Sequence, residues 1–190
     1  MGRPKESLPF GEETLLHRIA AVLLEGAEPV VAVRRSARQV LPELPAGVAT
    51  IADAVPGQGP LGAFATGLRH ARTVGGLDER DALFVTGCDS PFLTARTLAW
   101  LAGELDENEA VVPTPGGVPQ PLCAVYRLSC GPVAEALLAR GTAGLRDLAE
   151  AVDARRLDEG ALRQHDPELR FLRNVNTPED YRRALADAAY

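Results

Sequence analysis

One carboxylate, Asp89, stands just beyond an apolar run of the chain, residues 82–85 (Ala-Leu-Phe-Val). An apolar run of this length between turn residues predicts a buried parallel strand. Open α/β sheets bind their ligands beyond the carboxyl ends of such strands, and a carboxylate there can hold a divalent metal that bridges nucleotide phosphates. The same residue could instead cap the helix expected to start near Thr94. Its position alone leaves both interpretations open.

Other polar residues follow predicted strands or precede predicted helices. Asp53 ends a second short strand and is followed by a Gly/Pro-rich loop, residues 56–60. Lys5 lies in a loop ahead of the first helix. It could bind a phosphate, or it could be a solvated lysine near the chain terminus. Asn174 and Asn176 belong to an Asn-Val-Asn-Thr-Pro segment, which is also a favourable turn for starting a helix.

Composition narrows the class of protein. A chain of 190 residues with 46% hydrophobic and 24% charged residues is typical of one globular domain, and we assign residues 1–190 to a single domain. The net charge of −6 argues against nucleic acid or an anionic membrane as a partner. Three cysteines without a CxxC pair favour a reducing cytoplasm. A zinc site is not expected, because the three histidines are scattered and none lies at ligand spacing from a cysteine. No apolar run approaches the roughly 18 residues of a membrane span.

Strand and helix patterns alternate along the chain. Predicted strands cover residues 29–33, 48–51, 82–85, 110–112 and 121–126. Predicted helices cover residues 15–26, 61–71, 133–139, 145–152 and 178–188, and another runs from near Thr94 to residue 105. Thr14 caps the first helix, and Thr177 and Asp180 form a capping box on the last. This order predicts an α/β fold with a doubly wound, mostly parallel, Rossmann-like sheet in three layers, α on β on α.

The motifs along the whole chain resemble those of the molybdenum cofactor guanylyltransferases. They are Met-Gly-Arg-Pro-Lys at residues 1–5, Asp53 with Gly-Pro-Leu-Gly at 59–62, Cys-Asp-Ser-Pro at 88–91, Gln-Pro-Leu at 120–122 and Asn-Val-Asn-Thr-Pro-Glu at 174–179. The last motif and Cys-Asp-Ser-Pro are the most specific. The resemblance implies an enzyme, a Mg²⁺-dependent nucleotidyltransferase that joins GMP from GTP to the phosphate of molybdopterin and releases pyrophosphate.

The resemblance also implies roles for individual residues. Asp89 would hold Mg²⁺ against the GTP phosphates, and Lys5 would place a positive charge on the triphosphate. Asp53 would support the nucleotide through its sugar and base or through the metal. Three loop residues would complete the nucleotide site: Gly59, Pro60 and Leu61. On the pterin side, the weaker candidates are Gln120, Asn174, Asn176 and the loop around Gly116 and Gly117.

The implied partners are GTP and molybdopterin, with or without its molybdenum. Enzymes that accept the finished cofactor and other proteins of cofactor biosynthesis are further candidates. Cys88 is expected to be a small buried residue and no nucleophile. Arg34, Arg35 and Arg38 are expected to form a solvated face.

Two alternatives remain open. The first is a different nucleotidyltransferase, either a cytidylyltransferase that acts on the same pterin or another NTP transferase. The cytidylyltransferase resembles the chain near Lys5 but typically reads Gly-Asp-Gln-Pro at the metal aspartate, so Cys-Asp-Ser-Pro favours guanine. The second alternative is a non-catalytic nucleotide-binding domain that has lost its phosphate loop.

The first motif carries a further expectation. In the family, Met-Gly-x-x-Lys ends a longer motif that a strand and a glycine-rich turn precede. We therefore expect the natural product to extend roughly a dozen residues upstream of Met1, the scale of one strand and its turn. The 190-residue chain is then expected to be less stable, to associate through an opened sheet and to be nearly inactive.

Overall fold

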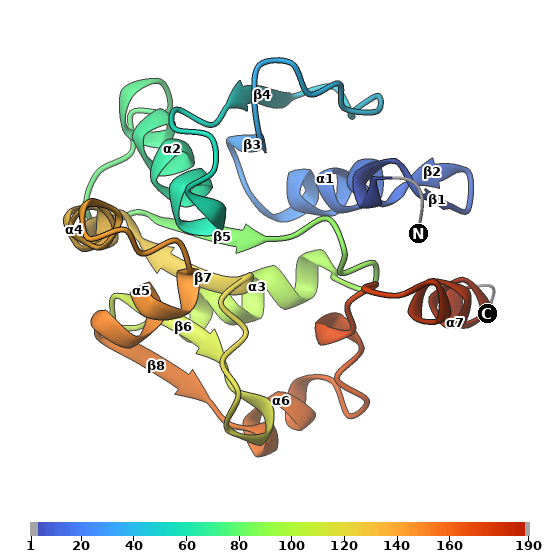
Figure 1. Ribbon diagram of the computed structural model, residues 1–190. Helices are drawn as coiled ribbons and strands as arrows, with labels where there is room; N and C mark the ends of the chain where they lie inside the picture. Colours follow the sequence, from blue (N-terminus) through green and yellow to red (C-terminus); the bar gives the residue numbers. More distant parts are fainter. Residues whose placement is uncertain (1–3, 189–190) are drawn as a thin grey trace.

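A computed structural model describes residues 4–188 and shows strands and helices alternating along the chain (Figure 1). The strands are β1 (Pro9–Phe10), β2 (Glu13–Thr14), β3 (Val30–Arg34), β4 (Val48–Ala52), β5 (Ala82–Thr86), β6 (Ala110–Pro113), β7 (Cys123–Arg127) and β8 (Ala154–Leu157). The α-helices are α1 (Leu15–Gly26), α2 (Gly59–Thr73), α3 (Ala95–Gly103), α4 (Gly131–Ala139), α5 (Leu145–Ala151), α6 (Glu159–His165) and α7 (Pro178–Ala188). Short 3-10 turns are η1 (Lys5–Ser7), η2 (Pro115–Gly117), η3 (Leu128–Cys130) and η4 (Arg170–Leu172). Within the described part of the chain, no helix is both long and apolar enough to cross a membrane.

The α/β class is confirmed, and the main strands form two sheets. One has four strands in the order β5-β7-β6-β8, with β6 and β8 parallel and β7 antiparallel to both of its neighbours. The other is the parallel pair β3 and β4, in register from Val30 opposite Val48 to Arg34 opposite Ala52. β7 reverses direction because the loop 114–122 is too short for the crossover that a parallel connection needs.

Helices cover both faces of the four-stranded sheet. Residues of β6 and β7 alternate between two core clusters, so that Tyr126 packs with α2, α4 and α5 while Val111 and Val125 pack with α1, α3 and α6. Tyr126 is fully buried, and its ring meets the edge of Phe64 at a centroid distance of 5.3 Å. The predicted three-layer arrangement is present on this sheet.

The predicted helix caps are confirmed. The Thr14 Oγ1 atom accepts a hydrogen bond from the backbone N–H of His17 at 3.2 Å. At the start of α7, the Thr177 N–H donates to Asp180 and the Asp180 N–H donates back to Thr177 Oγ1. These contacts satisfy N–H groups that a helix start otherwise leaves unpaired.

The strands β1, β2 and β8 and the helix α6 were not predicted. β8 reads Ala-Arg-Arg-Leu, and its two arginines are exposed because it forms the edge of the sheet. One predicted strand starts at another residue, since β7 begins at Cys123 and not at residue 121. The helix expected to start near Thr94 is confirmed, because α3 begins at Ala95 and the Thr94 side chain caps it.

Candidate functional site

Three predicted site residues from distant parts of the chain meet at one point. The Lys5 ammonium donates hydrogen bonds to Asp89 Oδ2 at 3.0 Å and to Asn176 Oδ1 at 2.6 Å. Lys5 lies in η1, Asp89 in the loop after β5, and Asn176 in the turn before α7. The side chains of Lys5 and Asp89 are 34% and 23% exposed, so the pair is shielded in part and still reachable by a ligand.

The loop after β5 is held in place by the segment before α7. The Val175 N–H donates to the Asp89 carbonyl at 2.8 Å, and the buried Ser90 hydroxyl donates to Asn174 Oδ1 at 2.8 Å. Asn174 is therefore brought to the site as a support of the loop. Gly87 leaves room for the carboxylate, because a Cβ there would lie 2.6 Å from Asp89 Oδ1.

The helix-cap interpretation of Asp89 is wrong. The residue that caps α3 is Thr94, whose Oγ1 atom accepts from the N–H of Thr97 at 3.2 Å. The Asp89 carboxylate does not cap the helix and instead accepts a hydrogen bond from Lys5.

Asp53 lies at the carboxyl end of β4, as expected. Its Oδ1 atom accepts hydrogen bonds from the Thr66 hydroxyl at 3.0 Å and from the Val55 N–H at 3.2 Å. These bonds fix the carboxylate against α2. Among the described residues, no hydrogen bond joins Asp53 to the Lys5 cluster.

The loop residues that precede and open α2 differ in their surroundings. Gly59 and Pro60 are exposed, whereas Leu61 is fully buried in the core, and its N–H donates to the Ala143 carbonyl. Gly59 has a φ of +62°, and a Cβ there would lie 2.7 Å from the Ala143 carbonyl oxygen. The side chain of Leu61 therefore packs in the core, and only its two predecessors offer an open surface.

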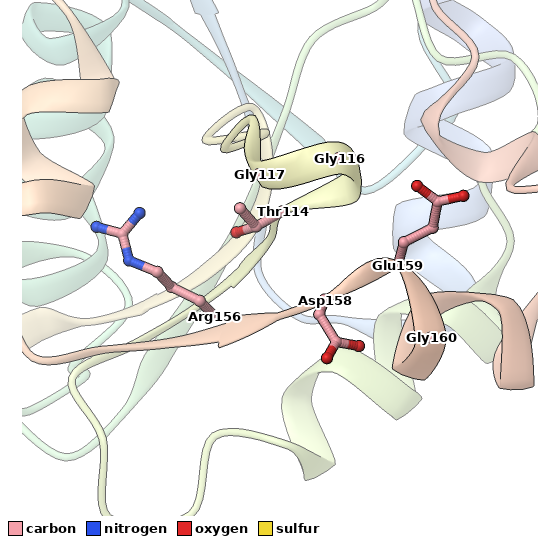
Figure 2. A pocket seen from close by; sticks show the side chains of 7 residues that line it. All are labelled: Thr114, Gly116, Gly117, Arg156, Asp158, Glu159 and Gly160. Atoms are coloured by element: carbon pink, nitrogen blue, oxygen red, sulfur yellow. The ribbon is translucent and has the colours of Figure 1, made fainter.

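Gln120 and the glycines of η2 lie near the carboxyl end of β6, and among the described residues no hydrogen bond joins the Gln120 side chain to Lys5. The Gln120 side chain is half-buried and its amide donates weakly to the Val118 carbonyl at 3.5 Å. A shallow cavity of about 460 Å³ opens beside η2. It is lined by Thr114, Gly116, Gly117, Arg156, Asp158, Glu159 and Gly160, whose charged ends point in different directions (Figure 2).

The cysteine beside Asp89 is a poor nucleophile. Burial, and then the charge of Asp89, raises the pKa of the Cys88 thiol to about 11. The thiol therefore stays protonated at neutral pH, and the thiolate is the reactive form.

The residues around Asp89 fit a magnesium ion that is shared with a phosphate ligand. Mg²⁺ is usually held by one or two carboxylates, with phosphate oxygens and water as the other ligands. Asp89 supplies one such carboxylate, and its side chain is 23% exposed. Across residues 4–188, no three His, Cys, Asp or Glu side chains gather in a cluster that could enclose a metal by themselves.

Sequence reasoning missed the residues that position the site, above all Ser90, Thr66 and Glu6. Ser90 lies inside a motif that the sequence singled out, so its position was the available signal. Thr66 and Glu6 carried no signal, because their partners, Asp53 and the Gln39 amide, are distant in the sequence.

The expected solvated face of arginines differs at Arg34. Its side chain has a buried Nε atom without a hydrogen-bond partner among the described residues, so it is less solvated than expected. Residues 1–3 of the first motif lie outside the described residues.

Comparison with known proteins agrees with the motifs. The model of the MobA-like NTP transferase domain matches residues 1–159. A probable molybdenum cofactor guanylyltransferase of Mycolicibacterium paratuberculosis is 37% identical over 99% of this chain and 89% of its own length. A relative with the same description from Carboxydothermus hydrogenoformans is 29% identical over 97% of this chain and 88% of its own.

Solved structures support the fold. The molybdopterin-guanine dinucleotide biosynthesis protein A of Archaeoglobus fulgidus aligns with a TM-score of 0.75 at 24% identity, covering 99% of this chain and 92% of that one. A 2-C-methyl-D-erythritol 4-phosphate cytidylyltransferase of Thermus thermophilus aligns with a TM-score of 0.72 at 17% identity, over 98% of this chain and 94% of its own. The chain therefore belongs to the MobA-like NTP transferase family and is a nucleotidyltransferase of that type.

Proposed function

We propose that this protein transfers GMP from GTP to the phosphate of molybdopterin, with release of pyrophosphate and in dependence on Mg²⁺. The observation that carries the proposal is the Lys5 ammonium held between Asp89 and Asn176 at the carboxyl end of β5. The names of the two relatives described above support guanine as the base and a molybdenum cofactor as the acceptor.

The proposed reaction asks for charge neutralisation and positioning. An oxygen of the acceptor phosphate attacks the α-phosphorus of GTP, and the bond from that phosphorus to the bridging oxygen of the β-phosphate breaks. The attacking oxygen is already anionic, so a strong general base is unnecessary. Negative charge builds on the leaving pyrophosphate, where a fixed positive group is most effective.

Each residue of the cluster has a part in this proposal. Asp89 would hold Mg²⁺, which supplies positive charge to the triphosphate when bound. Lys5 places its ammonium on the phosphates, and Asn176 keeps that ammonium directed by accepting one of its hydrogen bonds. In the free protein Lys5 and Asp89 neutralise each other, so neither charge lies unpaired in a partly buried place.

The remaining candidates divide between the two substrates. Asp53, tied to α2 through Thr66, and the exposed Gly59 and Pro60 form the nucleotide side. Gln120, with the cavity beside η2, forms the pterin side (Figure 2). GTP, molybdopterin and the enzymes that accept the finished cofactor are the proposed partners, and the cytoplasm is the proposed location.

Replacement of Asp89 tests the proposal. In Asp89→Asn we expect turnover to fall by roughly 100- to 1,000-fold, the usual effect of losing one group that stabilises transition-state charge. Folding should be preserved, because Asn has the same shape and Asp89 lies outside the core clusters. Pyrophosphate release from GTP, Mg²⁺ and molybdopterin measures turnover, and thermal melting measures the fold.

Asp106→Asn is the matched control. Asp106 is exposed at the opposite end of the sheet, before β6, and its φ of 43° suits asparagine. This variant should keep full activity. Equal activity of Asp89→Asn, or faster turnover with CTP than with GTP, would contradict the proposal.

A further inference from the structure

The hydroxyl of Thr66 makes its hydrogen bonds outside its own helix. A threonine inside a helix commonly donates to the carbonyl four residues earlier, and Thr73 of α2 does so, with Arg69 as its partner at 2.9 Å. The Thr66 hydroxyl instead donates to Asp53 Oδ1 at 3.0 Å and accepts from the Ala54 N–H at 3.2 Å. Its single proton is thus used by the loop after β4.

The two oxygen atoms of the Asp53 carboxylate have different surroundings. Oδ1 accepts two hydrogen bonds, one from Thr66 and one from the Val55 N–H. Oδ2 accepts none among the described residues. It is open to solvent, since Arg34 Nε is the only buried side-chain nitrogen or oxygen without a partner in residues 4–188. Oδ2 lies 3.5 Å from the place of a Cβ on Gly62, in the first turn of α2, so a ligand at the start of this helix can use it.

The bonds to Oδ1 determine where Oδ2 points. The torsion that turns the carboxylate of an aspartate has only a broad preference, so hydrogen bonds must hold it in one orientation. The Val55 N–H belongs to the same loop as Asp53 and moves with it. Thr66 belongs to α2, and its neighbour Ala65 is buried in the core. Of the two partners, Thr66 is therefore the one that ties the carboxylate to the rigid part of the molecule.

We propose that Thr66 is a positioning residue of the nucleotide site. It holds the Asp53 carboxylate so that Oδ2 accepts a hydrogen bond from an O–H or N–H group of the bound nucleoside. This role rests on the function proposed above. Since no hydrogen bond among the described residues joins Asp53 to Lys5 or Asp89, the contact contributes to nucleotide binding and not to metal binding or the chemical step.

Calorimetric titration with GTP tests this role. Thr66→Val keeps the branched shape of the side chain and lacks the hydroxyl. We expect the dissociation constant of GTP to rise about tenfold, the lower end of the effect of one hydrogen bond to a charged group. The rise should be the same with Mg²⁺ and with EDTA, because the contact involves no metal. In steady-state kinetics, KM for GTP should rise by a similar factor while kcat stays within about twofold.

Three further variants separate positioning from a loss of structure. Thr66→Ser keeps the hydroxyl and should bind GTP as the unsubstituted protein does. Thr73→Val removes a hydroxyl from the same helix and should also leave binding unchanged, because its partner is Arg69. Thr66→Val should add no further loss to Asp53→Asn, since both substitutions act on one contact. Melting curves of the same samples measure the fold.

Three results would overturn the inference. One is an unchanged dissociation constant in Thr66→Val. Another is a rise that disappears in EDTA, because Asp53 would then act through the metal. The third is an equal rise in Thr73→Val. Failure of the proposed function looks different: the unsubstituted protein would turn over CTP faster than GTP, while the titrations with either nucleotide would still show the effect of Thr66→Val.

Discussion

At the scale of residues, the site depends on one ammonium that serves two oxygen atoms. Lys5 is the donor to both Asp89 and Asn176, and the loop that carries Asp89 is bonded to residues 174 and 175. Hydrogen bonds to a charged group contribute about 1.5–3 kcal/mol when both partners are present. Asn176 is therefore proposed to direct Lys5 and not to react.

Asn176→Leu should lower kcat/KM roughly 10- to 100-fold, since the loss of one hydrogen bond to a charged group corresponds to about that factor. The residue is exposed, so the melting temperature should change little. Steady-state kinetics with GTP and molybdopterin, and melting curves of the same samples, check both expectations. Asn108→Leu is the control. Asn108 lies just before β6, and its amide donates to Asp153, so it takes no part in the Lys5 cluster. An equal loss of activity in both variants would refute the role given to Asn176.

At the scale of elements, the start of α2 links the nucleotide side of the site to the core. Asp53 binds Thr66 in this helix, Leu61 is buried below it, and Gly59 lies against the Ala143 carbonyl. A side chain at position 59 would push this end of the helix away. The glycine is required both by its positive φ and by the close contact.

Gly59→Ala should therefore cost more stability than Gly76→Ala. Gly76 has a similar φ of +67° but nothing within 4 Å of its added Cβ, compared with +62° and a 2.7 Å contact at Gly59. The left-handed conformation costs about 1–2 kcal/mol in both variants, and the contact adds about 1–3 kcal/mol at Gly59 alone. Urea denaturation of the two variants measures the difference. Equal free energies of unfolding would show that the Ala143 contact carries no strain.

At the scale of the whole molecule, two of the core clusters lie on either side of the four-stranded sheet. The cluster under α3 and α6 extends to the ring of His165, which stacks on Trp100 at 4.2 Å and forms a hydrogen bond with Thr97. Burial, and then the charge of Arg96, lowers the pKa of His165 below its usual range. The folded protein thus favours the neutral ring.

This shift predicts how stability depends on pH. Below about pH 6.5 the histidine of the unfolded chain takes up a proton before His165 of the folded chain does, so the free energy of unfolding falls. The contribution is fully present above the unfolded pKa and is lost as the pH falls toward the folded one. Urea denaturation measures the free energy of unfolding at pH 7.5 and 5.5. Its decrease between these pH values should be smaller for His165→Gln than for the unsubstituted protein, and the control His70→Gln should behave like the unsubstituted protein. The same drop in all three proteins would show that His165 does not couple to folding.

Local patterns determined much of this protein. The caps at Thr14 and Thr177, the strand before Asp89 and the three-layer α/β class follow from short-range hydrogen bonds and from apolar runs, so they could be predicted. The resemblance of the motifs to those of the family pointed to Lys5, Asp89 and Asn176. The edge strand β8 escaped prediction because its residues are mostly polar and only its sheet partner makes it a strand.

Only the tertiary structure decided which residues meet. Lys5 is separated from Asp89 by 84 positions and from Asn176 by 171, and contacts over such distances depend on how the sheets and helices pack. The same is true of the core position of Leu61, of the antiparallel β7 and of the bond between Thr66 and Asp53. The residue types supplied the possible chemistry, while packing selected the side chains that face a ligand, because burial and strand pairing are properties of the assembled chain.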